Sequence, residues 1–463
     1  MDYVEISNSM IVYLLCGITV AIAFVQAVLY IRMAKKMTVK ANIPATVPKT
    51  AFRVGLISAI GPALGVFIVM VGLMTSIGGP MAWQRLSIIG AAPTELTAAT
   101  LGAEAAGAEL GGAGFTLKVM AVSWFVMALN GAGWLVVTGL FTPALENLRT
   151  KMSGGDSKWL VVMSGACSLG IFGYLDVNEI GKGWGNAAAV AGGIIGMAIL
   201  EKFVAKKVPK IREYNLGIAM IIGMLFAIIY DMAVGAEEGM IMENKELMSE
   251  WKKNSIRIGT PTNLLAAFTS FIPVIWLCIT YNCWPDPKVV LAGWGMVALS
   301  FGAFYVVEPI SYYAALGLTG TYLSFLSGNI GNMRVPCATM ALETTESEPG
   351  TLQAEVASTM AICGSIITNL IATTAAVLVG SAVVSVLPDV IVSALTKYAA
   401  GAIFGGTFGT YALKYPKVAI FGMGLPLILK FTIAPPAWVL IVVSVFGSLG
   451  FARLLYVKEK KTS

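Results

Sequence analysis

The chain has 463 residues, of which 57% are hydrophobic and 12% are charged, and its net charge of +6 is spread over short polar segments. Soluble domains average about 25% charged residues, so this composition, with apolar stretches close to about 20 residues long, indicates a polytopic membrane protein without a nucleic-acid partner. The absence of histidine and of a Gly-x-x-x-x-Gly-Lys-Ser/Thr motif excludes a Ser-His-Asp triad, a His-Glu-x-x-His zinc site and a phosphate loop for ATP hydrolysis.

The first apolar run, Met10–Ile31, is followed by a short basic segment. Six lysine and arginine residues and no acid lie between positions 32 and 53. This charge bias places the loop in the cytoplasm and the N-terminus outside. The run is long and no small-residue cleavage site follows it, so we interpret it as a retained membrane helix and not as a signal peptide.

Further apolar runs continue along the chain. They are Val54–Ile77, Phe115–Thr142, Lys158–Leu175, Gly183–Glu201, Tyr214–Met232, Pro261–Tyr281, Lys288–Val307, Gln353–Val386, Asp389–Leu413, Pro416–Lys430 and Pro436–Val457. With the polar stretches described next, they predict an all-α, polytopic transmembrane helical bundle of about 12–14 membrane elements.

Two polar stretches interrupt the apolar sequence, at residues 78–114 and 308–350. In the second, Gly328, Gly331 and Pro336 disfavour a continuous helix. Non-helical backbone is tolerated at membrane depth only where protein buries it or where it lines a watery cavity. We therefore expect a broken helix or a re-entrant hairpin in each stretch, of the kind in which transporters place their ligands.

The middle of the chain changes character between residues 235 and 258, where acidic and apolar residues alternate at helical spacing. This pattern favours an amphipathic interfacial helix, and a solvated connecting loop is the alternative. In either case it acts as a linker between a first transmembrane half, residues 1–234, and a second, residues 259–463.

The two polar stretches also resemble each other. A shift of 239 positions places Ala99–Glu104 on Ala338–Glu343, with identical Ala, Thr and Glu residues, and places Asn130 on Asn369. We therefore expect two repeated halves, whose substrate and ion sites would lie near the midplane. Basic residues before the seventh span and in the C-terminal tail favour an inverted second half, although the span count alone does not give this result.

Ionisable residues inside a membrane are costly, so they are candidates for function. Arg334, beside Asn329 and Asn332, is expected to clamp a substrate carboxylate. A structural ion pair with Glu343 or Glu308 is the alternative.

The remaining candidates form two sets. Asn130 and Asn369 offer amides to an ion or a substrate, or make an interhelical hydrogen bond. Glu343 and its counterpart Glu104 are expected to hold a coupling cation or a substrate amine, unless they lie in water at a hairpin mouth or satisfy an arginine. Hydroxyl and backbone oxygens for a coupling cation are expected from Thr100, Thr339, Ser327, Gly328 and Gly331.

Several other polar or aromatic residues receive less specific interpretations. Glu308 either lines a cavity or faces the membrane interface. Asp176 and Glu179 fit an ordinary loop, and Trp134 fits an interfacial anchor. The six cysteines lack a Cys-x-x-Cys pair and fit small buried residues better than a metal or redox site.

The sequence around Gly328–Glu343 and the segment Ala91–Thr100 resemble an uncharacterised prokaryotic family of polytopic membrane proteins. The paired polar interruptions resemble those of ion-coupled secondary transporters with repeated halves. The first resemblance covers most of the chain and implies no substrate or site residue.

The sequence thus predicts a multi-pass protein of the cytoplasmic (inner) membrane, acting as a Na⁺- or H⁺-coupled secondary transporter of a small polar organic solute. An amino acid, a short peptide or a carboxylate is favoured, and an ion or solute channel is the alternative. No enzyme activity and no cofactor beyond a coupling Na⁺ are expected. A homodimer is left open.

Overall fold

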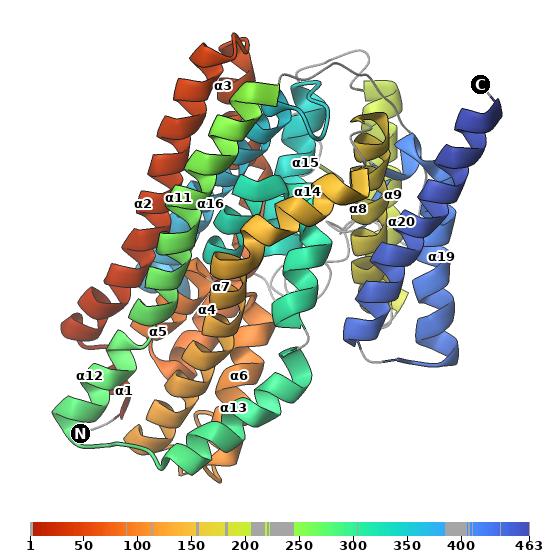
Figure 1. Cartoon of the computed structure of the whole chain (residues 1–463). Coiled ribbons are helices and arrows are strands. Elements are labelled where there is room, and N and C mark those ends of the chain that lie inside the picture. Colours follow the sequence, from red (N-terminus) through yellow and green to blue (C-terminus); the bar gives the residue numbers. More distant parts are fainter. Residues whose placement is uncertain are drawn as a thin grey trace.

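The computed structural model describes residues 3–88, 90–112, 114–153, 157–180, 184–204, 245–302, 304–384, 411–435 and 437–462, with six isolated positions between them. These residues form helices and turns and contain no strand (Figure 1). The predicted all-α class is therefore confirmed. The predicted spans Tyr214–Met232 and Asp389–Leu413, and the linker before residue 245, lie largely outside the described residues.

The helices of the first part of the chain are interrupted around Gly78 and between residues 88 and 91. They are α1 (Tyr3–Ser7), α2 (Met10–Lys40), α3 (Thr46–Ser58), α4 (Ile60–Ile77), α5 (Gly79–Ser87), α6 (Ala92–Ala105), α7 (Leu117–Ser153), α8 (Ser157–Ile180), α9 (Trp184–Ile199) and the π-helix η1 (Leu200–Val204).

The helices of the second part are interrupted in a comparable way around residues 317 and 328. They are α11 (Lys245–Thr269), α12 (Ile272–Tyr281), α13 (Pro287–Phe301), α14 (Phe304–Ser327), the π-helix η3 (Ile330–Arg334), α15 (Val335–Thr344), α16 (Leu352–Val384), α19 (Pro416–Thr432) and α20 (Ala437–Thr462).

Local sequence explains several helix ends. Asp286 caps α13 by accepting a hydrogen bond from the Lys288 amide at 2.8 Å, as expected of an N-cap carboxylate. α4 ends at Gly78, whose φ is 88°, a conformation that glycine adopts at little cost. α14 bends within its length at Gly317, where φ is 68°.

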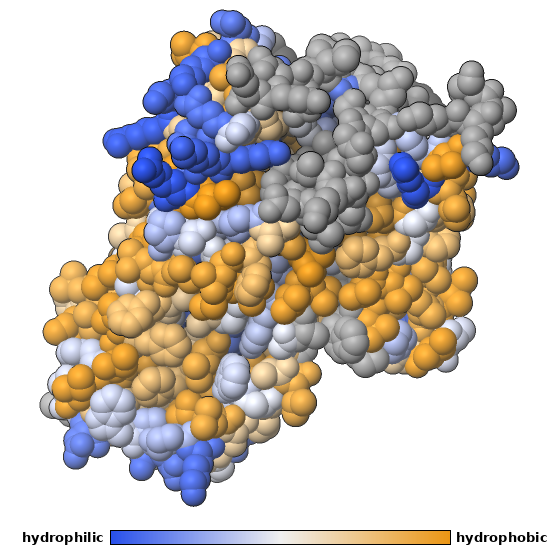
Figure 2. All heavy atoms as spheres, in the orientation of Figure 1, coloured by the Kyte–Doolittle hydropathy of each residue, from blue (hydrophilic) through white to orange (hydrophobic). Residues whose placement is uncertain are grey.

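Five helices among the described residues are long and apolar enough to cross a membrane, or six if the bent pair Pro287–Leu299 and Phe304–Tyr313 forms one span. Figure 2 shows a broad apolar belt between two hydrophilic ends on this face of the molecule. Such a belt suits a bilayer core about 30 Å thick. The chain is therefore a helical multi-pass membrane protein. The total of 12–14 elements and the identity of the membrane stay predictions.

The helices gather into two groups (Figure 1). Helices α8, α19 and α20 pack on one another, with α9 against α8, and form the smaller group. α8 approaches its partners through glycines, since a Cβ at Gly173 would meet the backbone of Gly422 and a Cβ at Gly170 would meet that of Ser444 and Val445. Small residues at such contacts are typical of membrane helix packing. The smaller group contacts the rest mainly through α14.

Within the larger group, α2 and α11 pack antiparallel (Figure 1). Gln26 donates to the Asn263 side chain at 2.9 Å, Tyr30 donates to the Ser255 carbonyl at 2.8 Å, and Lys40 forms an ion pair with Glu250 at 2.7 Å. The contacts rise along α2 as they fall along α11. The basic end of α2 therefore lies beside the start of α11, at the same end of the molecule.

Several helix contacts in one part of the chain have counterparts between the helices that lie 239 residues away in the other part. α6 packs on α7 and α13, and α15 packs on α16 and α3. Likewise, α7 packs on α11 and α13, while α16 packs on α2 and α3. Positive φ angles recur too, at Gly78 and Gly317 and at Gly111 and Gly350.

Two interpretations from the sequence are changed by the structure. Residues 245–258 form the first part of α11, and Trp251 and Ser255 on this part are fully buried, so neither a surface helix nor a loop describes them. Asp176 and Glu179 lie in α8 and not in a loop, and both are buried. The sequence did not predict this, because the apolar run ends at Leu175 whereas α8 continues for five more residues.

The contact between α3 and α16 gives a test of the packing. A Cβ at Gly55 would meet the Ala361 carbonyl, so we expect Gly55→Ala to lower the free energy of unfolding by about 1–3 kcal/mol through overpacking. Thermal unfolding of the purified protein measures this change. Gly450→Ala is the matched control, because a Cβ there meets nothing within 4 Å. Equal unfolding midpoints for the two variants would contradict the close α3–α16 contact.

Candidate functional site

Two helix breaks lie at the centre of the candidate site. The first separates α5 from α6 at residues 88–91. The second separates α14 from η3 at Gly328 and Asn329, whose φ angles are 63° and 52°. These are the stretches in which the sequence predicted broken helices. Each break exposes backbone groups that a bilayer cannot solvate, so protein groups must satisfy them.

A buried ion pair holds the first break. Arg85 in α5 donates from Nε to Glu95 Oε2 at 2.8 Å and from Nη2 to Glu95 Oε1 at 2.9 Å, and both residues are fully buried. Arg85 Nη2 also donates to the Met127 carbonyl at 2.9 Å, which ties the break to α7. A Cβ at Gly90 would meet the Glu95 carboxylate. The bidentate pair thus joins the two arms of the interrupted helix.

A buried arginine also holds the second break, in a different way. Arg334 donates from Nε to the Gly328 carbonyl at 3.0 Å and from Nη2 to the Ser327 carbonyl at 2.8 Å. Its Nη1 donates to Ser365 Oγ in α16 at 2.9 Å. Arg334 therefore satisfies carbonyls at the C-terminal end of α14, which have no intrahelical partner. The structure does not pair it with Glu343 or Glu308.

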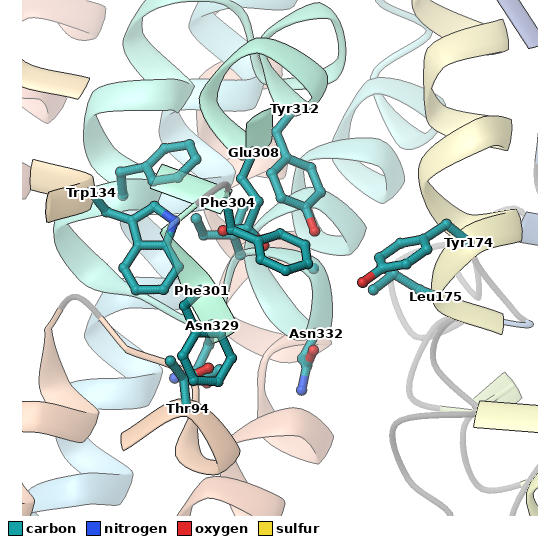
Figure 3. A pocket seen from close by; sticks show the side chains of 14 residues that line it. Thr94, Trp134, Tyr174, Leu175, Phe301, Phe304, Glu308, Tyr312, Asn329 and Asn332 are labelled. Atoms are coloured by element: carbon teal, nitrogen blue, oxygen red, sulfur yellow. The ribbon is translucent and has the colours of Figure 1, made fainter. Parts of the chain in front are cut away.

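A cavity of about 220 Å³ lies where the two breaks and α8 meet (Figure 3). Residues from α6, α7, α8, α13, α14 and η3 contribute to its wall. The lining residues are Ala91, Thr94, Trp134, Tyr174, Leu175, Phe301, Phe304, Glu308, Tyr312, Phe325, Asn329, Ile330, Gly331 and Asn332.

The cavity brings together part of the predicted site. The lining includes Asn329, Asn332 and Gly331. Glu308 also lines the cavity, so of the two positions considered for it, a cavity wall or the membrane interface, the structure has the cavity wall. Arg334 does not belong to the lining residues. Trp134 was interpreted as an interfacial anchor, but it is buried and lines the cavity.

One donor in this wall has no hydrogen-bond partner among the described residues. It is Asn329 Nδ2, on a side chain that is 3% exposed. A buried donor without a partner costs about 1–3 kcal/mol, so this amide is available to a ligand. The Trp134 indole in the same wall is directed to the Glu308 carboxylate, which is its hydrogen-bonding partner. Glu308 is the one carboxylate among the lining residues, which include no lysine or arginine.

The two predicted asparagines of the apolar helices lie outside the lining set. Asn130 Oδ1 accepts from the Tyr305 hydroxyl at 2.8 Å, and Asn369 Nδ2 donates to the Leu86 carbonyl at 3.1 Å. These bonds join α7 to α14 and α16 to α5. The interhelical role considered from the sequence therefore describes what these amides do in this structure.

The other predicted ion-coupling residues are dispersed. Glu343 forms an ion pair with Lys414 at 2.6 Å, and Glu104 is exposed near the end of α6. Thr339 Oγ1 lies 3.0 Å from the Tyr411 hydroxyl, and Thr100 Oγ1 donates to the Leu96 carbonyl. Ser327 Oγ donates to the Leu323 carbonyl. The described structure does not gather these oxygens around one cation, and their coupling role stays a prediction.

A buried acid next to the cavity was missed by sequence reasoning. Asp176 follows the lining residues Tyr174 and Leu175 in α8 and is fully buried. Neither of its carboxylate oxygens has a hydrogen-bond partner among the described residues. The signal available in the sequence was its position two residues after the aromatic Tyr174, directly against an apolar run. A buried acid without a hydrogen-bond partner in a membrane protein is a candidate for carrying a proton or binding a cation.

The contribution of the Arg85–Glu95 pair to stability can be tested by substitution. Glu95→Gln leaves the Arg85 charge buried without a carboxylate, so we expect a loss of about 3–5 kcal/mol in unfolding free energy. The double variant Arg85→Met, Glu95→Leu removes both charges and is expected to recover most of that loss. Thermal unfolding of the purified variants tests this. A single variant as stable as the unmodified protein would show that the pair does not hold the break.

A protein-family model described as "Domain of unknown function (DUF5058)" matches residues 8–224. The chain is similar to that family over a region that includes the first break and the Arg85–Glu95 pair. Neither the curated proteins nor the solved structures gave a match.

Proposed function

We propose that this protein is a cation-coupled secondary active transporter of a small polar organic solute and works by alternating access in the cytoplasmic membrane. The observation that carries the proposal is the cavity at the meeting point of two interrupted helices, with the buried Asn329 amide donor that lacks a partner. Interrupted helices are where transporters commonly bind solutes and coupling ions. In this proposal the cavity is the substrate site.

The proposal includes an inverted duplication of the chain. Supporting it are the antiparallel packing of α2 and α11 and the contacts that recur 239 residues apart, such as α6 with α13 and α15 with α3. The ion pair between Lys40 and Glu250 also brings the basic end of α2 next to the start of α11. The positive-inside rule assigns both ends to the cytoplasm, which is what an inverted second half requires.

Alternating access would move the smaller helix group against the larger one. Tyr174 and Leu175 of α8 form one wall of the cavity, while residues of α6, α7, α13, α14 and η3 form the others. The Tyr174 side chain points from α8 toward the cavity across from Trp134 and Glu308 (Figure 3). A displacement of α8 with its partners α19 and α20 would therefore open or close the cavity. Rocking of one unit against another around a fixed site is a common transport mechanism.

In this proposal Asp176 is the candidate residue for binding the coupling cation, Na⁺ or H⁺. Its carboxylate is buried without a partner, next to the mobile wall that the proposal assigns to α8. Binding a cation there would neutralise a charge that is costly in a bilayer. Glu104 and Glu343 stay alternatives for this role.

Uptake into proteoliposomes tests the function. With an imposed Na⁺ or H⁺ gradient we expect saturable accumulation of at least one solute from a broad panel of amino acids, short peptides and organic acids. Collapse of the gradient with an ionophore is expected to abolish the accumulation. Single-channel currents without coupled uptake would support a channel instead, and the absence of any gradient-driven uptake would refute the transporter.

The role of Asp176 can be tested separately. Asp176→Asn keeps the shape of the side chain but cannot be ionised, so we expect gradient-driven uptake to fall at least about tenfold while downhill exchange of the solute persists. Asp286→Asn is the control, because asparagine caps a helix about as well as the aspartate that caps α13. Unchanged coupling in Asp176→Asn would remove this residue from the mechanism.

A further inference from the structure

We propose that the cavity binds a zwitterion, an α-amino acid with an apolar side chain, with its carboxylate at the starts of α6 and η3 and its ammonium group at Glu308. The proposal rests on the transport function above for its biological meaning, but the binding it describes can be measured without transport. Three features of the cavity wall support it independently.

The first feature is a pair of helix starts at one cavity. Ala91 and Thr94 line it at the beginning of α6, and Ile330, Gly331 and Asn332 line it at the beginning of the continuous helical stretch formed by η3 and α15. The first amides of a helix have no intrahelical partner and carry a partial positive charge. Two such ends at one cavity favour a negatively charged group.

The second feature adds a donor to these helix starts. Asn329 Nδ2 is buried in the wall and has no partner among the described residues. Asn329 directly precedes η3, so its amide lies at the same end of the cavity as the η3 start. A carboxylate can accept from several donors at once, which would satisfy groups that are costly to leave unpaired.

The third feature suits a positive charge. Glu308 provides a carboxylate, and in Figure 3 its side chain lies between those of Trp134 and Tyr312, with Phe304 beside it. An ammonium group is attracted both by the carboxylate and by aromatic faces within about 6 Å of the ring centre. The cavity therefore offers recognition to both ends of a zwitterion.

The buried arginines narrow the choice of ligand. Arg85 is bound by Glu95, and Arg334 donates to carbonyls at the end of α14 and to Ser365, and neither lines the cavity. A plain organic acid would therefore meet the Glu308 carboxylate without a lining cation to offset it. A plain amine would leave the Asn329 donor unpaired.

The size and remaining wall define the rest of the ligand. A cavity of about 220 Å³ has the volume of roughly seven water molecules at about 30 Å³ each. Phe301, Phe325 and Leu175 supply apolar surface in this wall. A small amino acid with an aliphatic or single-ring side chain fits these limits, whereas a peptide of several residues does not.

Matched ligand sets test the inference on the purified full-length protein. Each set contains an amino acid, the amine that lacks its carboxylate and the acid that lacks its ammonium group: leucine with 3-methylbutylamine and 4-methylpentanoate, valine with 2-methylpropylamine and 3-methylbutanoate, and phenylalanine with 2-phenylethylamine and 3-phenylpropanoate. At about 10 mM, roughly ten times a millimolar Kd, we expect at least one amino acid to raise the unfolding midpoint, and its two analogues to bind at least about tenfold more weakly.

Two variants assign the two ends of the ligand. Glu308→Gln is expected to weaken amino-acid binding about tenfold or more and not to weaken binding of the acid analogue, because the carboxylate that opposes the acid is removed. Asn329→Gly keeps the left-handed backbone while removing the amide. It is expected to weaken binding of the amino acid and the acid but not of the amine. Glu5→Gln, at an exposed position in α1, is the control and should bind like the unmodified protein.

The outcomes separate this inference from the transport proposal. Binding of an amino acid that depends on Glu308, without gradient-driven uptake, would refute the transport function and support the zwitterion site. Gradient-driven uptake of a plain acid or amine in place of an amino acid would support the transport function and refute the zwitterion site. If no amino acid in the three sets binds, or if Glu308→Gln weakens the amino acid and the acid equally, the inference is overturned.

Discussion

The structure depends on one constraint, which is that backbone groups exposed by a helix break must find partners inside the protein because a bilayer offers none. A buried arginine lies at each break, and at the second break it binds the freed carbonyls directly. Arg85 binds the Glu95 carboxylate and the Met127 carbonyl, and Arg334 binds the carbonyls of Ser327 and Gly328. Once these contacts exist, the two helix starts can lie beside a cavity without collapsing the surrounding helices onto it.

The two breaks occupy related places but use different chemistry. Arg334 lies 239 residues after Glu95, the same shift that relates the recurring contacts and the positive φ angles at Gly78 and Gly317. At the first break the acid at this position, Glu95, accepts hydrogen bonds from Arg85 in the preceding helix. At the second break the residue at this position, Arg334, donates hydrogen bonds to carbonyls at the end of the preceding helix. An asymmetric pair of this kind lets one scaffold hold two different walls of one cavity.

The wall of the cavity suits the polar solute proposed as its ligand because its charges are sparse and localised. Glu308 is the one carboxylate in the lining set, and the Asn329 amide donor is available at the start of η3. Aromatic rings supply much of the remaining wall. Few, well-separated polar groups in an apolar site fix the orientation of a ligand. The position of Asp176 behind one wall would let a coupling cation respond to movement of α8.

The sequence by itself determined the helical class, the membrane setting and the two polar stretches in which helices break, because apolar length and the polar residues and glycines that interrupt it are local properties. It also placed Asn329 at the second break. Only the tertiary structure decided that Arg334 serves the backbone, that Trp134 and Glu308 face one cavity, and that α8 extends far enough to bury its acids. These outcomes depend on the path of the backbone at a break and on which helices pack together, and composition and spacing along the chain carry no record of either.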